Sequence, residues 1–184
     1  TARRLLERLE SVMADDYIIR AYNKDMVFFG GLFVLKPAVD SIGLDKAGEW
    51  LYYGAMTHAS MFRVRVADLK NPDLSAAELE AKVEVFGPKP LSDGISLDLQ
   101  GNVYITDVEN DGVAVLGQDR RLRTLIKDER VRWADALSFG PDGWLYLADS
   151  SIPDLMLMPR SHVEARRPYY LFRFRPGTVG VPGQ

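Results

Sequence analysis

One phrase occurs three times in this chain and constrains its fold more than any other feature. Each copy has an aspartate, a short alternating apolar run, a glycine eight residues after the aspartate, and a second apolar run. The copies begin at Asp40, Asp93 and Asp135, which lie 53 and 42 residues apart. A repeat with a period in this range is typical of arrays built from one supersecondary unit, so the repeat sets the fold class.

Each repeat predicts antiparallel strands joined by a tight turn. The run after the aspartate alternates, as expected for a strand that is buried on one face, and the glycine suits a turn that needs positive φ. Four antiparallel strands in a unit of about 40–50 residues are typical of a β-propeller blade. We therefore predict an all-β propeller, with blade units at roughly 38–86, 90–130 and 132–175.

The segments outside the three repeats carry weaker patterns. Residues 1–16 fit either an amphipathic helix or an outer strand at 3–9 followed by a loop. We expect residues 1–37 together to form part of a preceding blade. The capping box Ser75-Ala-Ala-Glu78 predicts a short helix over roughly 76–84. The other expected segments are strands at 17–22 and 26–29 around a turn at 23–25, a long loop or lid at 150–163, and a final strand at 169–175.

About three and a half blades do not close a ring, because closed propellers have roughly four to eight. An open half-propeller exposes edge strands and an apolar face between blades. We therefore expect the missing N-terminal blades of the same protein to be the partner of this chain. Assembly with another molecule is the alternative.

Composition and charge exclude several classes of function. The chain has 184 residues and a formal net charge of −3, which gives no electrostatic footprint for nucleic acid. No apolar run reaches the roughly 18 residues of a membrane-spanning helix. Cysteine is absent, which excludes disulfides and thiolate metal sites. Arginines cluster between positions 120 and 132, and a solvated face is the simplest interpretation of that cluster.

The three leading aspartates are the main candidate site residues. Propeller geometry would bring Asp40, Asp93 and Asp135 to the mouth of the central channel, each just before an innermost strand. Oxygen ligands that converge there suit a hard cation, with Ca²⁺ favoured and Mg²⁺ or Mn²⁺ as alternatives. Without a cation the carboxylates would repel one another, and at least one pKa would rise. The alternative for each aspartate is a structural bond to turn amides.

Two further side chains are candidate ligand-binding residues. Trp133 lies two residues before the third aspartate and could line the mouth, although packing between blades suits each tryptophan of the chain. His58 follows the second strand of the first repeat, near a blade end. A role in a turn is the alternative for His58, and also for His162. Asp107 and Asp149 end strands, so we expect them to bond neighbouring turns.

Several stretches carry a resemblance to a known family. They are Ser-Asp-Gly-Ile at 92–95, Gly-Asn-Val-Tyr-Ile-Thr-Asp at 101–107, Gly-Pro-Asp-Gly-Trp-Leu-Tyr at 140–146 and Tyr-Leu-Phe-Arg-Phe-Arg-Pro-Gly at 170–177. From about residue 38 the chain resembles bacterial members of the yellow / major royal jelly protein family, often labelled as related to gluconolactonases. The resemblance implies a six-bladed propeller, of which this chain covers roughly the C-terminal three to four blades. It also implies a small-molecule ligand at one channel mouth and a secreted or periplasmic protein.

The related senescence-marker / gluconolactonase branch implies a divalent metal held by a first-blade Glu, an Asn and an Asp. Asp93-Gly94 matches the Asp-Gly motif of that branch. Asp40-Ser41 stands where the branch has Asn-Gly, and the first-blade Glu is not in this chain. The first functional hypothesis is therefore ligand binding at the mouth. The alternatives are a metal-dependent lactone hydrolase, with Asp93 as ligand or general base, and an interaction platform of rim loops around Ile152–Met158.

Overall fold

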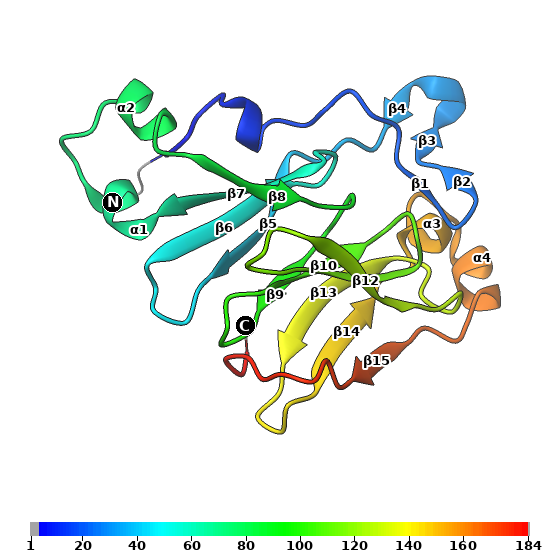
Figure 1. Ribbon diagram of the computed structural model, residues 1–184. Helices are drawn as coiled ribbons and strands as arrows, with labels where there is room; N and C mark the ends of the chain where they lie inside the picture. The colour runs from blue at the N-terminus through cyan, green and yellow to red at the C-terminus, as the bar shows by residue number, and fades with distance from the viewer. Residues whose placement is uncertain (1–3, 184) are drawn as a thin grey trace.

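Three antiparallel sheets follow one another along the chain in a computed structural model that describes residues 4–183 (Figure 1). The first sheet consists of β5 (Val39–Leu44), β6 (Trp50–Ala55), β7 (Ser60–Arg65) and β8 (Glu84–Pro88). The second consists of β9 (Ile95–Leu97), β10 (Val103–Asp107), β11 (Gly112–Leu116) and β12 (Leu122–Lys127). The third consists of β13 (Ala134–Phe139), β14 (Leu145–Asp149) and β15 (Leu171–Phe174). In every sheet the strands lie in chain order, as in propeller blades, and the predicted all-β propeller fold is confirmed.

The innermost strands of the three sheets lie side by side. Strand β9 neighbours both β5 and β13, so the starts of all three strands come together at one end of the assembly. The sheets span 39–88, 95–127 and 134–174, where the sequence predicts units at 38–86, 90–130 and 132–175. The third sheet has three strands where the first two have four.

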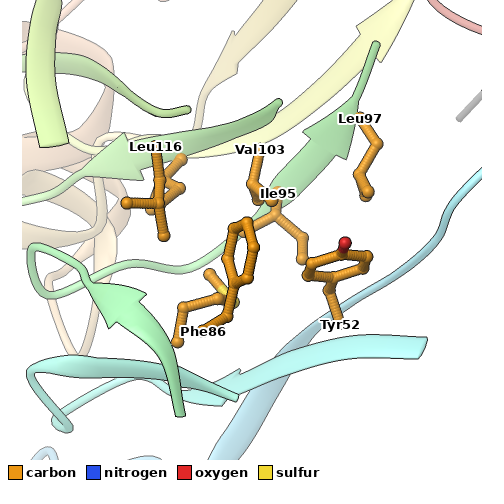
Figure 2. Close-up of a cluster of buried hydrophobic side chains, with 8 residues drawn as sticks. Tyr52, Phe86, Ile95, Leu97, Val103 and Leu116 are labelled. Atoms are coloured by element: carbon orange, nitrogen blue, oxygen red, sulfur yellow. The ribbon is translucent and has the colours of Figure 1, made fainter. Parts of the chain in front are cut away.

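An apolar cluster joins the first sheet to the second (Figure 2). Tyr52 and Phe86 project from the first sheet with their rings edge to face, 5.0 Å apart between centroids. They meet apolar side chains of the second sheet, all of which are buried. The labelled members from that side are Ile95, Leu97, Val103 and Leu116. Burial of such side chains stabilises by roughly 1.5–3 kcal/mol each, so this cluster fixes one blade against the next.

A second cluster joins the second sheet to the third in the same way. Tyr104 packs edge to face against Phe139, with ring centroids 5.4 Å apart. The C-terminal tail closes the far end of this interface, because Leu99 N–H donates to the carbonyl of Val179 (2.9 Å) and Gly183 N–H donates to the carbonyl of Phe139 (2.9 Å). The two interfaces make the three blades one packed unit.

The N-terminal segment does not extend the first sheet. It forms two separate hairpins, β1 (Arg20–Ala21) with β2 (Lys24–Asp25), and β3 (Val27–Phe28) with β4 (Phe33–Val34). The expected strands at 17–22 and 26–29 are therefore reduced to two residues each. The first turn lies at Tyr22-Asn23, both with positive φ, and not at 23–25.

The apolar residues of these hairpins instead cover the ends of the blade strands. In Figure 1 the hairpins lie beside α3 and α4, above the ends of the sheets. The buried cluster that they build contains Ile19, Ala21, Met26, Met56, Val108 and Trp133. The buried apolar residues of 17–35 thus lie in a cap over one end of the blades. Residue propensity alone does not distinguish such a cap from a strand.

Residues 4–16 contain a single 3₁₀ turn, η1 (Glu10–Val12). The amphipathic helix does not form, and Leu6 and Arg8 have positive φ, which a helix forbids. Residues 4–9 form no strand either; residues 1–3, the start of both predictions, lie outside the described part. Leu6 and Val12 nevertheless pack against the outer face of the first sheet. A second 3₁₀ turn is η2 (Phe29–Gly31).

Short helices fill the long connections. The predicted capping box begins α2 (Ala76–Glu80), with Glu78 N–H donating to Ser75 Oγ (3.3 Å) and Ser75 N–H donating to the Glu78 carboxylate (2.9 Å). Helix α1 (Val66–Lys70) precedes it. The segment predicted as a loop or lid holds α3 (Ile152–Leu155) and α4 (Arg160–Ala165). No helix among residues 4–183 is long and apolar enough to cross a membrane.

Candidate functional site

Two of the three candidate aspartates occupy β-bulges. The register between β5 and β6 shifts between Val39 and Ser41, so Asp40 is the extra residue. The register between β13 and β14 shifts between Ala134 and Ala136, which makes Asp135 the extra residue there. Both aspartates were expected just before the innermost strand, and the structure places them inside it. Bulges turn a side chain out of the regular alternation and are common beside active sites, so both carboxylates are redirected at the same end of the blades.

Asp93 lies between these two bulges, two residues before β9. The adjacent Gly94 explains why the chain can approach so closely, since a Cβ at that position would lie 2.4 Å from the carbonyl oxygen of Asp135. The indole N–H of Trp133 donates to Asp93 Oδ2 at 2.6 Å. The Asp-Gly pair therefore has a packing reason here, and it brings Asp93 toward Asp135.

The electrostatic state of Asp93 follows from this environment. The pKa of Asp93 is raised to about 7, chiefly by burial. The hydrogen bond from Trp133 acts in the opposite direction, and the neighbouring carboxyls of Asp135 and Asp40 add to the rise. The groups that act on this pKa are neutral or acidic. Asp93 is thus a partly buried carboxyl that loses its proton near neutral pH, a state well suited to proton transfer.

The donor atoms suit a hard cation, but the set is incomplete. Asp93 and Asp40 could offer carboxylate oxygens, and one Asp93 oxygen already accepts the Trp133 N–H. Ca²⁺ takes about six to eight oxygen ligands. Among residues 4–183 no group of three or more His, Cys, Asp or Glu side chains is arranged to hold a metal ion. The described residues therefore do not by themselves fit a resident metal.

Trp133 is packed in the core, and its ligand-binding role stays a prediction. Its side chain is 1% exposed and belongs to the cluster beneath the N-terminal hairpins. Its N–H, at the same time, reaches the candidate site. The backbone N–H of Trp133 donates to the carboxylate of Asp149 (2.8 Å), so its position is fixed from both ends. Trp144 is different, since it is half-buried and stacks under the guanidinium groups of Arg173 and Arg175.

The other candidate residues are engaged elsewhere. His58 Nδ1 accepts from the backbone N–H of Ser60 (3.1 Å), and its ring packs against Phe62. Neither contact involves the candidate aspartates, and the ligand-binding role of His58 stays a prediction. Asp107 accepts from Asn110 N–H (3.1 Å) in a turn.

One feature that the sequence interpretation missed is a charged centre at Asp154. Its carboxylate is fully buried and lies 3.1 Å from Lys24 Nζ, 3.2 Å from Arg132 Nη1 and 3.0 Å from Arg166 Nε. Arg132 was expected on a solvated face together with its neighbours. The structure corrects this, because Arg132 is 7% exposed and lies inside the molecule. The partners come from distant segments, so no local signal could have indicated the centre.

A cavity of about 800 Å³ lies beside this charged centre and away from the three aspartates. Its lining mixes arginines with carboxylates. Arg130 and Arg167 in the lining already pair with Asp128 and Glu164, which lie outside it. The residues that line this cavity therefore do not indicate whether it would bind an anion or a cation.

Comparison with known proteins agrees with the fold. No family model matches the chain. A nucleoside triphosphate pyrophosphatase from Leifsonia xyli subsp. xyli is 27% identical over 92 residues, which cover 48% of this chain and 43% of that protein. At this identity and coverage the match does not show a family.

Two solved structures share the architecture. Regucalcin from Agrobacterium tumefaciens, a calcium-binding protein, matches with a TM-score of 0.51 and 18% identity over 82% of this chain and 50% of its own. A luciferin-regenerating enzyme matches with a TM-score of 0.56 and 14% identity over 82% of this chain and 51% of its own. This chain thus spans about half the length of the solved structures it matches. At these identities the likeness concerns the fold alone, which is a β-propeller.

Proposed function

We propose that Asp93 is the general base of a hydrolase that opens lactones or similar esters, as the gluconolactonase resemblance suggests. The observation that carries the proposal is a partly buried carboxyl with a pKa of about 7, placed between two redirected carboxyls and fixed by an indole N–H. A general base with a pKa near the working pH is deprotonated in a large fraction of the molecules and still has a high affinity for the proton that it must accept.

The reaction would use the oxygen of Asp93 that Trp133 does not engage. Asp93 Oδ1 would take a proton from a water molecule while the water oxygen forms a bond to the lactone carbonyl carbon. The ring C–O bond then breaks, and the leaving oxygen takes the proton back from Asp93. The product is a hydroxy acid.

Ligand binding without turnover, as in the yellow-type hypothesis, is the second candidate function. It is favoured by the clustering of Asp40, Asp93 and Asp135, since a cationic or hydrogen-bond-donating ligand would relieve their repulsion. Both functions use the same residues. They differ in whether the ligand is consumed, so one assay separates them.

The test is the hydrolysis of δ-gluconolactone by the full-length protein, followed by acid release against the spontaneous rate, with Ca²⁺ and with a chelator. We expect Asp93→Asn to lower kcat by about 10²–10⁴-fold. The matched control is Asp119→Asn, an exposed carboxylate paired with Arg123, which should leave kcat unchanged. Wild-type protein that does not exceed the spontaneous rate under either condition contradicts the hydrolase. Lactone binding without consumption would then support the second function.

A further inference from the structure

Lys89 is a buried lysine in the linker between the first two blades, and its side chain is 4% exposed. Its Nζ donates to Pro90 O (3.0 Å), to Met56 O (3.4 Å) and to Ser92 Oγ (3.0 Å). Its stem passes over Gly54, where a Cβ would lie 2.7 Å from Lys89 Cε. Burying an ammonium group costs several kcal/mol before compensation, so a lysine in this place requires a reason.

The bonds from Lys89 continue toward the candidate site with a fixed direction. Ser41 Oγ donates to the backbone carbonyl of Asp93 (2.9 Å). Because that bond uses the Ser41 proton, Ser41 Oγ accepts from Ser92 Oγ, which lies 3.3 Å away. Ser92 Oγ in turn accepts from Lys89. Each hydroxyl thus accepts one hydrogen bond and donates one, and the chain runs from the ammonium group to Asp93.

The other side of the Asp93 backbone is held as well. Thr106 Oγ1 accepts from the N–H groups of Asp93 and Gly94, both at 3.0 Å. The carbonyl of Asp93 is held by the serine chain, its N–H by Thr106, and its carboxylate by Trp133. Ser41 and Ser92 are 2% and 0% exposed, so neither can meet a substrate.

We propose that Lys89, Ser92 and Ser41 are positioning residues that fix the orientation of Asp93 through one directed hydrogen-bond chain. Burial lowers the pKa of Lys89 to about 7, while the carboxylate of Asp107 opposes this shift. The protonated form is the one that donates to all three acceptors, because a neutral amine has two N–H groups. Successive bonds in such a chain strengthen one another. Loss of Ser41 therefore removes the bond to the Asp93 carbonyl, and loss of Ser92 or Lys89 weakens it. The geometric part of this inference stands alone, and its catalytic consequence rests on the proposed function.

The indole N–H of Trp133 provides a direct measure of the Asp93 carboxylate. Its ¹H–¹⁵N signal is assigned with Trp133→Phe and compared in Ser92→Ala, Ser41→Ala and Lys89→Met. We expect each variant to shift this signal and to leave the indole signals of Trp50 and Trp144 in place. Ser11→Ala is the matched control, a buried serine whose bond partner is Tyr53 (2.9 Å), and it should leave all indole signals unmoved.

An unmoved Trp133 signal in Ser92→Ala overturns the inference, even if Lys89→Met fails to fold. A second measurement tests whether the chain acts as a unit. We expect Ser92→Ala and Ser41→Ala each to lower kcat by about 10-fold with KM unchanged, and the double variant to lower it no further. If the two reductions in kcat multiply in the double variant, the two serines do not act through a single hydrogen-bond chain. If wild-type protein shows no hydrolysis, the proposed function fails while the indole signal still decides the positioning role.

Discussion

Asp93, which is partly buried, and Asp154, which is fully buried, are two aspartates with opposite surroundings. Burial acts against ionisation of Asp154, yet Arg166 and Lys24 outweigh burial and lower its pKa. Burial also acts on Asp93, but the nearest charged groups there are carboxyls, and its pKa rises to about 7. The same residue type is therefore a stable anion in one place and a titrating acid in the other.

The difference distinguishes an aspartate that stabilises the fold, Asp154, from one that is a candidate for chemistry, Asp93. Asp154 joins the first N-terminal hairpin through Lys24, the linker before β13 through Arg132, and α4 through Arg166. Its charge is compensated by elements that it holds together. In the part of the chain that the structure describes, no cation acts on the pKa of Asp93. The free-energy cost of burying its charged form is therefore not offset in the folded state. Proteins accept such a cost chiefly at functional sites, which is why the uncompensated aspartate is the better candidate for chemistry.

The largest expected effect follows from removing the compensated charge. Asp154→Asn keeps the side-chain shape but leaves Arg166 without its buried counter-charge and Arg132 with Asp149 alone, 3.8 Å from its Nε. We expect the free energy of unfolding to fall by about 3–5 kcal/mol, as for buried ion pairs broken on one side. Chemical denaturation followed by tryptophan fluorescence measures the change.

The matched control for this variant is Asp119→Asn. Asp119 pairs with Arg123, and both side chains are about half exposed, so the expected loss is below about 1 kcal/mol. Equal losses in the two variants would show that compensation at Asp154 does not stabilise the fold, and the comparison between the two buried aspartates would fail.

The sequence predicted the blades because their signal is periodic and local. Alternating runs and turn glycines appear in every repeat, and the capping box at Ser75 marks the start of α2 within the chain itself. The N-terminal segment was harder to predict for the complementary reason, and its place in a preceding blade stays a prediction. Its apolar residues suit either a sheet or a cap over strand ends, and only contact with Met56 and Val108 decides between them.

The candidate site was predictable in part. The repeated aspartates predicted that three carboxyls gather at one end of the blades, and Asp40 and Asp135 do lie close enough to act on Asp93. The functional role of these residues stays a prediction. The bulges at Asp40 and Asp135 could not be predicted, since register depends on pairing with β6 and β14. The bond from Trp133 joins residues 40 positions apart, and a single sequence contains no signal for such a contact.

The next prediction concerns the pH dependence of stability. The pKa of Asp93 rises from 3.8 to about 7 on folding, so the folded state binds this proton more tightly than the unfolded chain does. The resulting stabilisation is complete below about pH 4 and is lost as pH rises through 7. Asp93→Asn removes this loss. We expect it to match wild type near pH 4 and to be more stable by about 1–2 kcal/mol at pH 8, after allowance for partial exposure.

Denaturation at both pH values measures the difference between Asp93→Asn and wild type. Glu80→Gln, an exposed carboxyl in α2, serves as the control with no expected gain at pH 8. A loss of stability at pH 8 in Asp93→Asn would mean that the Asp93 charge is compensated after all, and Asp93 would then resemble Asp154.

The smallest expected effect tests how the compensation at Asp154 is shared. Lys24 Nζ donates to Asp154 Oδ1 and to the carbonyl of Pro153, both at 3.1 Å, but its side chain is 40% exposed. Arg132 and Arg166 still neutralise Asp154 when Lys24 is lost. We therefore expect Lys24→Met to reduce the free energy of unfolding by about 0.5–1 kcal/mol, and hydrogen exchange to rise in the first hairpin alone. A loss as large as that of Asp154→Asn would instead mean that the exposed lysine carries the compensation, and the two arginines would then be only packing partners of the carboxylate.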